Sequence, residues 1–155
     1  YILKKKYQNK HKYKIYNYAI SNYNRKSYFC INKNPKTSTL FNNIQENFSH
    51  QIKSKISPYN KKVLVNVRKL NTVLKNEIYK NSLLKIDVEG NEYNVLLGSM
   101  KILKNLKYIF FEDKFITNSK NKNKIFKLLR KNNFILINKV STFPYHFKDY
   151  LFQKK

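Results

Sequence analysis

One short stretch holds features that are rare in the rest of the chain. Residues 83–92 read LLKIDVEGNE, so an apolar run ends in carboxylates and a glycine, and a helix-like pattern follows. The chain has eight acidic residues, and three of them lie in this stretch. It has two glycines, and one of them, Gly90, lies here as well. Gly90 suits a tight strand-to-helix turn that requires a positive φ. The stretch therefore predicts a functional turn at the end of a strand.

The hydrophobic spacing alternates between strand and helix periods from residue 63 onward. The predicted strands are Val63–Val67, Ser82–Val88, Tyr108–Phe111, Phe134–Asn138 and Tyr150–Gln153. The predicted helices are Lys69–Tyr79, a helix of about fourteen residues after Gly90, and Ser119–Lys131. This order is typical of an α/β fold with a mainly parallel sheet. The last two strands predict an antiparallel hairpin, and the continuously apolar third strand predicts burial on both faces.

The first sixty residues carry weaker signals. Lys14–Ser21 and Ser27–Ile31 are rich in β-forming residues and predict two strands, and Leu40–Phe48 predicts a short helix. At 155 residues, the chain fits one domain, residues 1–155, with a real hydrophobic core.

The expected architecture places acidic residues together. In open α/β sheets, ligands bind in the crevice outside the carboxyl ends of the strands. One predicted strand ends at Asp87 with Glu89 beyond it, and the next ends at Glu112 and Asp113. One crossover helix joins these strands, so we expect them to be neighbours that face the same crevice.

The alternative is that these acids are solvated loop residues. In that interpretation Glu92 only complements the helix dipole, and Asp113 is exposed. Gly98 falls inside the predicted helix, where glycine costs about 1 kcal/mol relative to alanine. A close approach of this helix to the sheet would explain the glycine.

The net charge of +25 invites a nucleic-acid or membrane function. Only three of the 33 basic residues are arginine, however, and lysine, asparagine, tyrosine and isoleucine dominate the composition. Codons rich in A and T would produce this bias without selection for binding. Arginine forks, which clamp phosphates and read bases, are scarce. The charge alone therefore does not establish a nucleic-acid-binding protein.

Other classes of site lack support in the sequence. The single cysteine, Cys30, forms no internal disulfide, and His11, His50 and His146 show no metal-ligand spacing. No apolar run reaches the length of a membrane span, and the first residues lack the core of a signal peptide. We expect a soluble, cytoplasmic protein without a metal site and without a membrane partner. The sequence does not define its oligomeric state.

The central stretch carries a resemblance to a known family. Residues 84–92, LKIDVEGNE, followed by VLLG at 95–98, resemble the LKIDVEG-x-E-x-x-VL-x-G signature of FkbM-family methyltransferases. Other segments resemble further strands of that family, from about Lys14 to the end of the chain. They are Tyr18–Ser21, Val63–Val67 followed by Leu70, Tyr108–Glu112 and Asp149–Phe152.

The resemblance implies a Rossmann-like, S-adenosylmethionine-dependent enzyme that methylates an oxygen of a sugar or another small-molecule acceptor. Such a transfer needs an oriented acceptor hydroxyl, and a nearby carboxylate can take its proton. Asp87 is the first candidate, followed by Glu89 and Glu112 as substrate-site carboxylates. By resemblance, Tyr18 and Ala19 lie where such folds contact the adenine of the cofactor.

Two departures from the family pattern qualify this expectation. Asn71 stands where the family commonly has an aspartate, and no segment resembles the glycine-rich cofactor loop or the acidic residue that grips the ribose. We therefore expect residue 1 to fall inside a longer methyltransferase, with the N-terminal strands and most of the cofactor loop outside these residues. The alternatives are a non-catalytic, basic nucleic-acid-binding module and an inactive, truncated relative.

Overall fold

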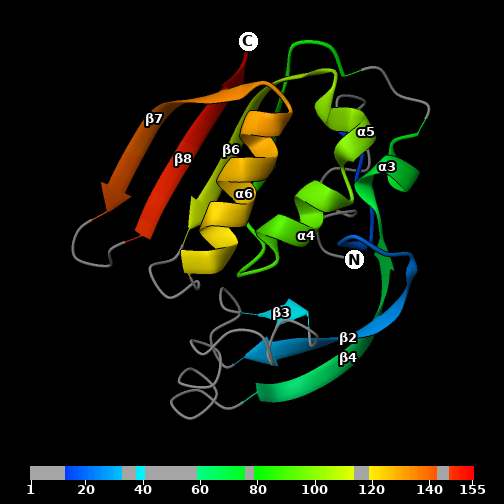
Figure 1. The fold of residues 1–155 in the computed structure, drawn as a ribbon. Helices are drawn as coiled ribbons and strands as arrows, with labels where there is room; N and C mark the ends of the chain where they lie inside the picture. Colours follow the sequence, from blue (N-terminus) through cyan, green and yellow to red (C-terminus); the bar gives the residue numbers. More distant parts are fainter. Residues whose placement is uncertain (1–12, 33–37, 41–58, 76–78, 114–118, 143–146) are drawn as a thin grey trace.

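The computed structural model describes residues 13–32, 38–40, 59–75, 79–113, 119–142 and 147–155. These residues form two four-stranded sheets (Figure 1). The first sheet has the order β1-β4-β2-β3. Its strands are β1 (Ala19–Ile20), β2 (Arg25–Asn32), β3 (Thr39–Leu40) and β4 (Tyr59–Arg68). The second has the order β5-β6-β8-β7. Its strands are β5 (Ser82–Ile86), β6 (Leu106–Asp113), β7 (Phe134–Thr142) and β8 (Phe147–Lys154).

The prediction of a mainly parallel sheet is confirmed only in part, because both sheets are mixed. Among the described strands, only β1 with β4 and β5 with β6 pair in parallel, and the other pairings are antiparallel. The α/β class and the C-terminal antiparallel hairpin are confirmed, and both hairpin strands are longer than expected. Val63–Val67 belongs to β4 of the first sheet, where it pairs with β2. Its exposed Leu64 and Asn66 alternate with more buried valines, which is typical of an antiparallel strand with one open face.

The helices are α3 (Leu70–Val73), α4 (Glu92–Leu97), α5 (Met100–Leu103) and α6 (Ser119–Lys131). The bounds predicted for α6 are confirmed. The predicted long helix after Gly90 is instead two short helices, with Gly98 and Ser99 between them. The helix predicted to begin at Lys69 is seen only as α3, and residues 76–78 lie outside the described residues. The helix predicted at Leu40–Phe48 also lies outside them, apart from Leu40 in β3.

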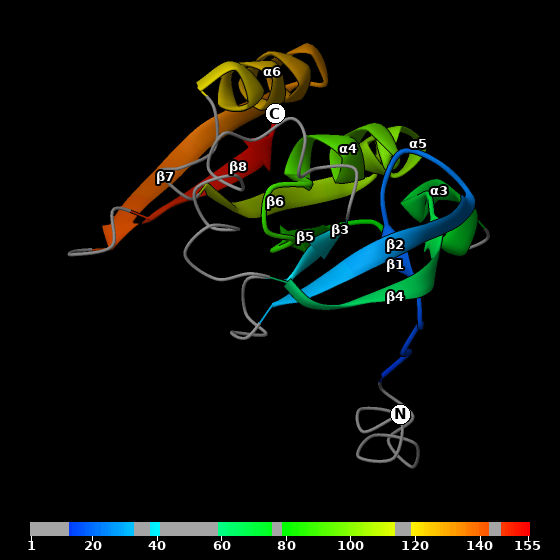
Figure 2. The same ribbon diagram turned by 90° about the horizontal axis from the view of Figure 1, so that it is seen from below.

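The hydrophobic core lies between the second sheet and its helices. Helices α4, α5 and α6 cover one face of this sheet (Figure 2). The buried core residues are Ile86, Val95, Leu96, Ile102, Leu103, Leu106, Ile109, Phe111, Ile125, Leu129, Phe134, Tyr150 and Phe152. The Phe111 ring stacks on Tyr150 with 5.3 Å between ring centroids. Tyr108 and Phe110 point to the other face and are only half-buried. The predicted burial of this strand on both faces is therefore wrong for the face away from the helices.

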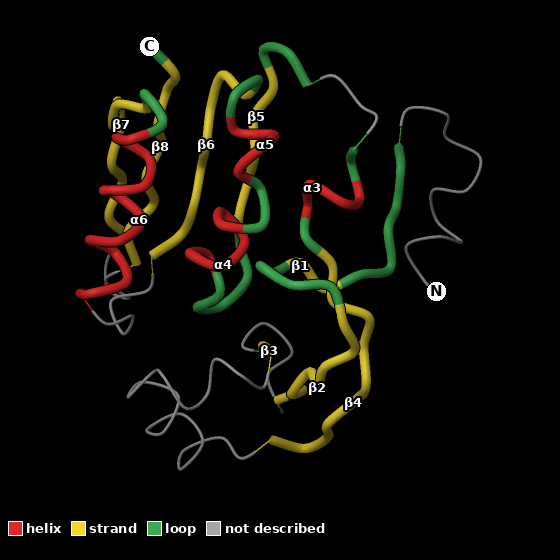
Figure 3. Tube along the Cα trace, turned by 45° about the vertical axis from the view of Figure 1, so that its right-hand side comes forward, coloured by secondary structure: helices red, strands yellow, loops and turns green. Residues whose placement is uncertain are grey.

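The backbone that follows β1 lies against the helices of the second sheet (Figure 3), and Gly98 makes a close contact there. A Cβ atom at position 98 would overlap the backbone carbonyl oxygen of Ser21. The predicted close approach of Gly98 is confirmed, and its partner is the backbone that follows β1. The Gly98 carbonyl accepts a hydrogen bond of 3.0 Å from the Asn71 backbone N–H. This contact explains why the apolar helix pattern breaks into α4 and α5 at Gly98.

Asn71 has a structural role at the same junction. Its side-chain oxygen Oδ1 accepts a hydrogen bond of 3.1 Å from the backbone N–H of Lys101, near the start of α5. An aspartate, the residue common in the family at this position, would offer the same acceptor. The departure from the family pattern therefore removes a charge at position 71 and keeps the hydrogen-bond acceptor that joins α3 to α5.

Candidate active site

Every acidic residue in the described part of the chain lies at one edge of the second sheet. These residues are Asp87, Glu89, Glu92, Glu112, Asp113 and Asp149. The parallel pairing of β5 with β6 brings their carboxyl ends together, as predicted, and β8 starts at the same edge. We call this set the acidic edge. It gathers at one edge all described acids of a chain whose net charge is +25.

The strand register divides the acidic edge into two sides. Ile86 pairs with Phe111, so Asp87 and Glu112 follow at the next step of the ladder and point to the same face. Asp149 lies opposite Glu112 on β8. These three residues form the outer side, which faces away from α4, α5 and α6. Asp113 points to the opposite face, where it meets Glu92, and these two form the helix side.

The turn between β5 and α4 is held in a left-handed conformation. Glu89 has φ 54° and Gly90 has φ 100°, which confirms the positive φ predicted for Gly90. A non-glycine residue in this region costs about 1 kcal/mol or more. The Glu89 carbonyl accepts a hydrogen bond of 3.2 Å from Thr39 Oγ1, which helps to hold the turn. This turn changes the direction of the chain between β5 and α4, so that Glu92 faces the end of β6.

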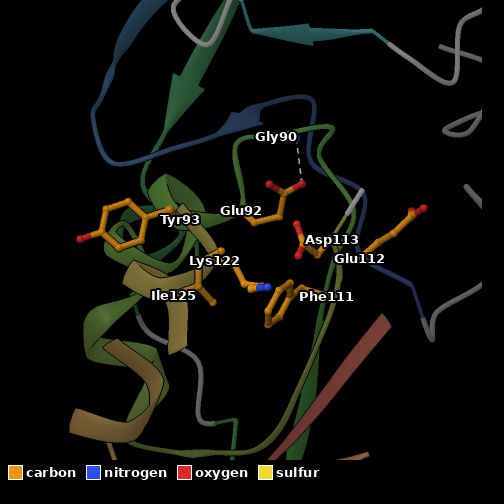
Figure 4. Close-up of a pocket in the computed structure, with 8 residues that line it drawn as sticks. All are labelled: Gly90, Glu92, Tyr93, Phe111, Glu112, Asp113, Lys122 and Ile125. Carbon is orange, nitrogen blue, oxygen red and sulfur yellow. Dashed lines mark hydrogen bonds between the residues drawn. The ribbon is translucent and has the colours of Figure 1, made fainter. Parts of the chain in front are cut away.

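Glu92 is the most perturbed carboxyl group of the acidic edge. Its side chain accepts a hydrogen bond of 2.9 Å from the Gly90 backbone N–H (Figure 4). The pKa of Glu92 is raised from 4.5 to about 7, mainly by burial. The nearby charges of Glu89 and Asp113 add to this rise, and its backbone hydrogen bonds oppose it. Glu92 is therefore partly protonated at neutral pH. The alternative in which Glu92 only complements the helix dipole does not account for this burial.

A small hollow lies around Glu92. It is lined by Gly90, Glu92, Tyr93, Phe111, Glu112, Asp113, Lys122 and Ile125. The carboxyl groups of Glu92 and Asp113 point toward one another in it, whereas Glu112 points away (Figure 4). The expectation that Asp113 is exposed is wrong, because it is partly buried beside Glu92. The cavity volume is about 10 Å³, which is about the room that one water molecule needs. The helix side therefore contains a pair of carboxyl groups, and its hollow is too small for a substrate.

The outer side is accessible to solvent at Asp87. The Asp87 side chain is 47% exposed, and its carboxylate lies 3.7 Å from Lys85 Nζ, which is itself 62% exposed. Such an exposed ion pair holds the carboxylate only weakly. Of the three predicted catalytic carboxylates, the register thus places Asp87 and Glu112 on one face, and Glu89 lies in the turn beside them. Their catalytic roles stay predictions.

The residues predicted to contact the cofactor lie next to this edge. Ala19 pairs with Val67 in the first sheet. Tyr18 is 44% exposed, and the Arg68 guanidinium lies 5.6 Å from its ring centroid. The next carbonyl along β1, that of Ile20, accepts a hydrogen bond of 3.0 Å from the Asn91 side chain. The Asn91 side chain thus joins β1, one residue beyond Ala19, to the turn at Gly90.

Two contributors to the site were missed in the sequence. Asn91, which joins the turn to β1, gave no pattern beyond its place in the turn. Glu92 did carry a signal, because it falls on the helical stripe of Val95, Leu96 and Ser99, all of which are buried. A carboxylate at a core-facing helical position, two residues after a turn glycine, predicts a buried acid.

The comparisons with known proteins agree with the signature. The family model of the methyltransferase FkbM domain matches residues 2–136, which is most of the 155-residue chain. The chain belongs to the FkbM methyltransferase family. A search of the curated proteins gave no match, and neither did a search of the solved structures.

The described ranges show neither a membrane-spanning helix nor a metal site. No helix there is long and apolar enough to cross a bilayer. The same residues contain no group of three or more histidine, cysteine or acidic side chains placed to hold a metal ion. His11, His50 and His146 lie outside the described residues.

Proposed function

We propose that this protein transfers a methyl group from S-adenosylmethionine to a hydroxyl oxygen of a sugar or another small-molecule acceptor. The observation that carries the proposal is the acidic edge, which combines the family signature with every described carboxylate of a strongly basic chain. Bound S-adenosylmethionine supplies an electrophilic methyl group on a positively charged sulfur. A cluster of carboxylates at the strand ends suits a cationic group through simple Coulomb attraction.

The described residues fit one side of that cofactor. Tyr18 offers an aromatic ring of the kind that stacks on a base, and the carboxylates beside Gly90 would face the positive sulfur. Both glycines have other tasks, because Gly90 forms the left-handed turn and Gly98 contacts Ser21. A glycine-rich backbone cradle for the cofactor is therefore not formed by the described residues.

The outer side is where the acceptor would bind. Asp87 is exposed and weakly paired, so its carboxylate is free to accept a hydrogen bond from an acceptor hydroxyl. Asp87 would take the hydroxyl proton as the oxygen bonds to the methyl carbon and the methyl–sulfur bond breaks, which would release S-adenosylhomocysteine. Glu112, on the same face of the neighbouring strand, would orient the acceptor. Glu89 would hold its place in the turn, and its charge adds to the field at the methyl group.

The test combines cofactor binding with turnover. Calorimetric titration of S-adenosylmethionine into this chain, and into a version extended upstream to include any cofactor loop, should give binding in at least one of the two. Methyl transfer should appear as S-adenosylhomocysteine release with methyl glycosides as acceptors. Asp87→Asn should lower turnover by about 10²- to 10⁴-fold, with cofactor affinity nearly unchanged. The matched control is Asp149→Asn, which removes the same charge from the same face one strand beyond Glu112.

The outcomes separate the possible roles. Equal loss of affinity and turnover in Asp87→Asn would move this residue from the acceptor side to the cofactor side. Equal effects of Asp87→Asn and Asp149→Asn would show that only the general negative field matters. Absence of any S-adenosylmethionine binding would contradict the proposal.

A further inference from the structure

The strand β7 has an unusual outer edge. It is the last strand of the second sheet, at the end opposite β5, and in the described part of the chain no strand pairs with its other side (Figures 1 and 3). Four of its apolar side chains are 41–51% exposed, namely Ile135, Leu136, Ile137 and Val140. Edge strands are normally protected by charges, proline or a short length, because their free N–H and C=O groups can pair with another chain.

The hydrogen-bond pattern shows which groups of β7 face outward. The Lys155 backbone N–H donates to the Asn133 carbonyl at 2.9 Å, and Phe134 and Leu136 lie opposite Lys154 and Phe152. In an antiparallel ladder, alternate residues direct their N–H and C=O groups toward the partner strand and away from it. Phe134 and Leu136 therefore present these groups to the outer edge. The β7 edge is a template for one more strand.

The charges around β7 indicate the chemistry of such a strand. Exposed cations surround it, at Arg130 and Lys131 on the end of α6, at Lys139 within β7 and at Lys155 beyond β8. From residue 119 to residue 155 the sequence contains ten lysines and arginines and one acid, Asp149. A hollow of about 440 Å³ lies at the start of β7, lined by Arg130, Asn133, Phe134, Ile135, Leu136 and Lys155. Its two cations and its apolar wall suit a segment with both acidic and apolar side chains.

We propose that the outer edge of β7 is a docking site for an extended partner segment that carries alternating apolar and acidic side chains. The segment adds a strand to the sheet, with its backbone bonded to β7 and its side chains placed on alternate faces. A second copy of this chain fits less well, because pairing β7 with β7 brings two basic rims together. The site is at the other end of β7 from the acidic edge, and it does not depend on methyl transfer.

The test uses the full chain and three short capped peptides. One alternates valine with glutamate, a second replaces valine with serine, and a third replaces glutamate with lysine. We expect the valine–glutamate peptide to bind, the serine–glutamate peptide to bind at least about tenfold more weakly, and the valine–lysine peptide not to bind. Anisotropy of the labelled peptides measures each affinity. Hydrogen exchange of the Phe134 and Leu136 amides should slow when the first peptide is bound.

The key variant is Ile135→Lys, matched with Leu83→Lys. Both residues are exposed apolar residues of the two edge strands of one sheet, with exposed fractions of 41% and 57%. Each change adds one positive charge, so electrostatic attraction for the acidic peptide should increase in both. Ile135→Lys should nevertheless weaken binding by at least about tenfold, whereas Leu83→Lys should not weaken it. Circular dichroism confirms that both variants keep the fold.

Three results would overturn the proposal. Equal binding of the serine–glutamate and valine–glutamate peptides would reduce the effect to general charge attraction. Wild-type affinity in Ile135→Lys would place the peptide on another surface, and a selective loss in Leu83→Lys would place it on β5. A dimer in sedimentation that Ile135→Lys dissolves would identify a second copy of the chain as the occupant.

Discussion

The two sides of the acidic edge carry the same kinds of side chain in opposite environments. On the helix side, Glu92 is 7% exposed and shares a small hollow with Asp113. On the outer side, Asp87 is 47% exposed and forms an ion pair with the exposed Lys85. Adjacent residues of β6, Glu112 and Asp113, point one to each side.

This difference shows that the position of each carboxyl group in the fold, and not its residue type, determines whether it is buried or exposed. A buried acid with a raised pKa makes the free energy of unfolding depend on pH. An exposed acid contributes little to stability and is free to contact an acceptor. We therefore expect the helix side to be sensitive in stability measurements and the outer side to be sensitive in activity measurements.

The largest effect is expected from Gly98→Ala, between the two helices α4 and α5 that follow the turn. The added Cβ would overlap the backbone carbonyl oxygen of Ser21. Because backbone atoms cannot rotate away as a side chain can, the free energy of unfolding should fall by about 3 kcal/mol. Urea denaturation measures this loss. Gly90→Ala is the comparison, because its left-handed φ of 100° costs a smaller amount, about 1 kcal/mol. A loss at Gly98 below that at Gly90 would mean that α4 does not rest on the end of β1.

The second effect is a pH dependence that Glu92 should cause. A carboxyl group whose folded pKa is raised from 4.5 to about 7 binds its proton more tightly in the folded protein. Its contribution to stability is therefore fully present below pH 4.5 and is lost as the pH rises through 7. Over this window the wild type should lose about 3 kcal/mol from Glu92. Glu92→Gln keeps an acceptor for the Gly90 N–H, so it should remove this loss and be more stable than the wild type at pH 8.

The control for this variant is Glu112→Gln, which lies in β6 on the outer side of the acidic edge. It should leave the pH dependence between 4.5 and 7 as it is in the wild type. Chemical denaturation at several pH values between 4 and 8 measures both variants. If Glu92→Gln retains the wild-type slope, Glu92 is not the buried acid that the helix side requires, and the contrast between the two sides fails.

The parts predicted correctly from the sequence depend on local patterns. The helix over Ser119–Lys131 has a clear apolar period, the turn at Gly90 needs a residue that tolerates positive φ, and the last two strands are close in sequence. The gathering of Asp87 and Glu112 also followed from local information, because one crossover joins their strands. Each of these features is determined by neighbouring residues or by a short connection.

The parts predicted wrongly depend on contacts between distant residues. Val63–Val67 pairs with β2 across about forty residues, and its alternating pattern fits either kind of sheet. The long helix breaks because Gly98 must approach Ser21, which is remote in sequence. The side taken by Asp113 depends on the register of β6 with its neighbours, since a shift of one residue exchanges the two faces. Tertiary contact decides all three.

The smallest expected effect is on the outer side, from Lys85→Met. The Lys85–Asp87 pair has both partners largely exposed at 3.7 Å, so its loss should change the free energy of unfolding by less than about 0.5 kcal/mol. Lys104→Met, an exposed lysine at the end of α5, makes the same charge change away from the acids. Urea denaturation at low and at high salt should give nearly equal values for both variants. A loss above about 1 kcal/mol confined to Lys85→Met would mean that Asp87 is held in place like Glu92. In that case Asp87 would not be free to contact an acceptor, and the proposed role of the outer side would be wrong.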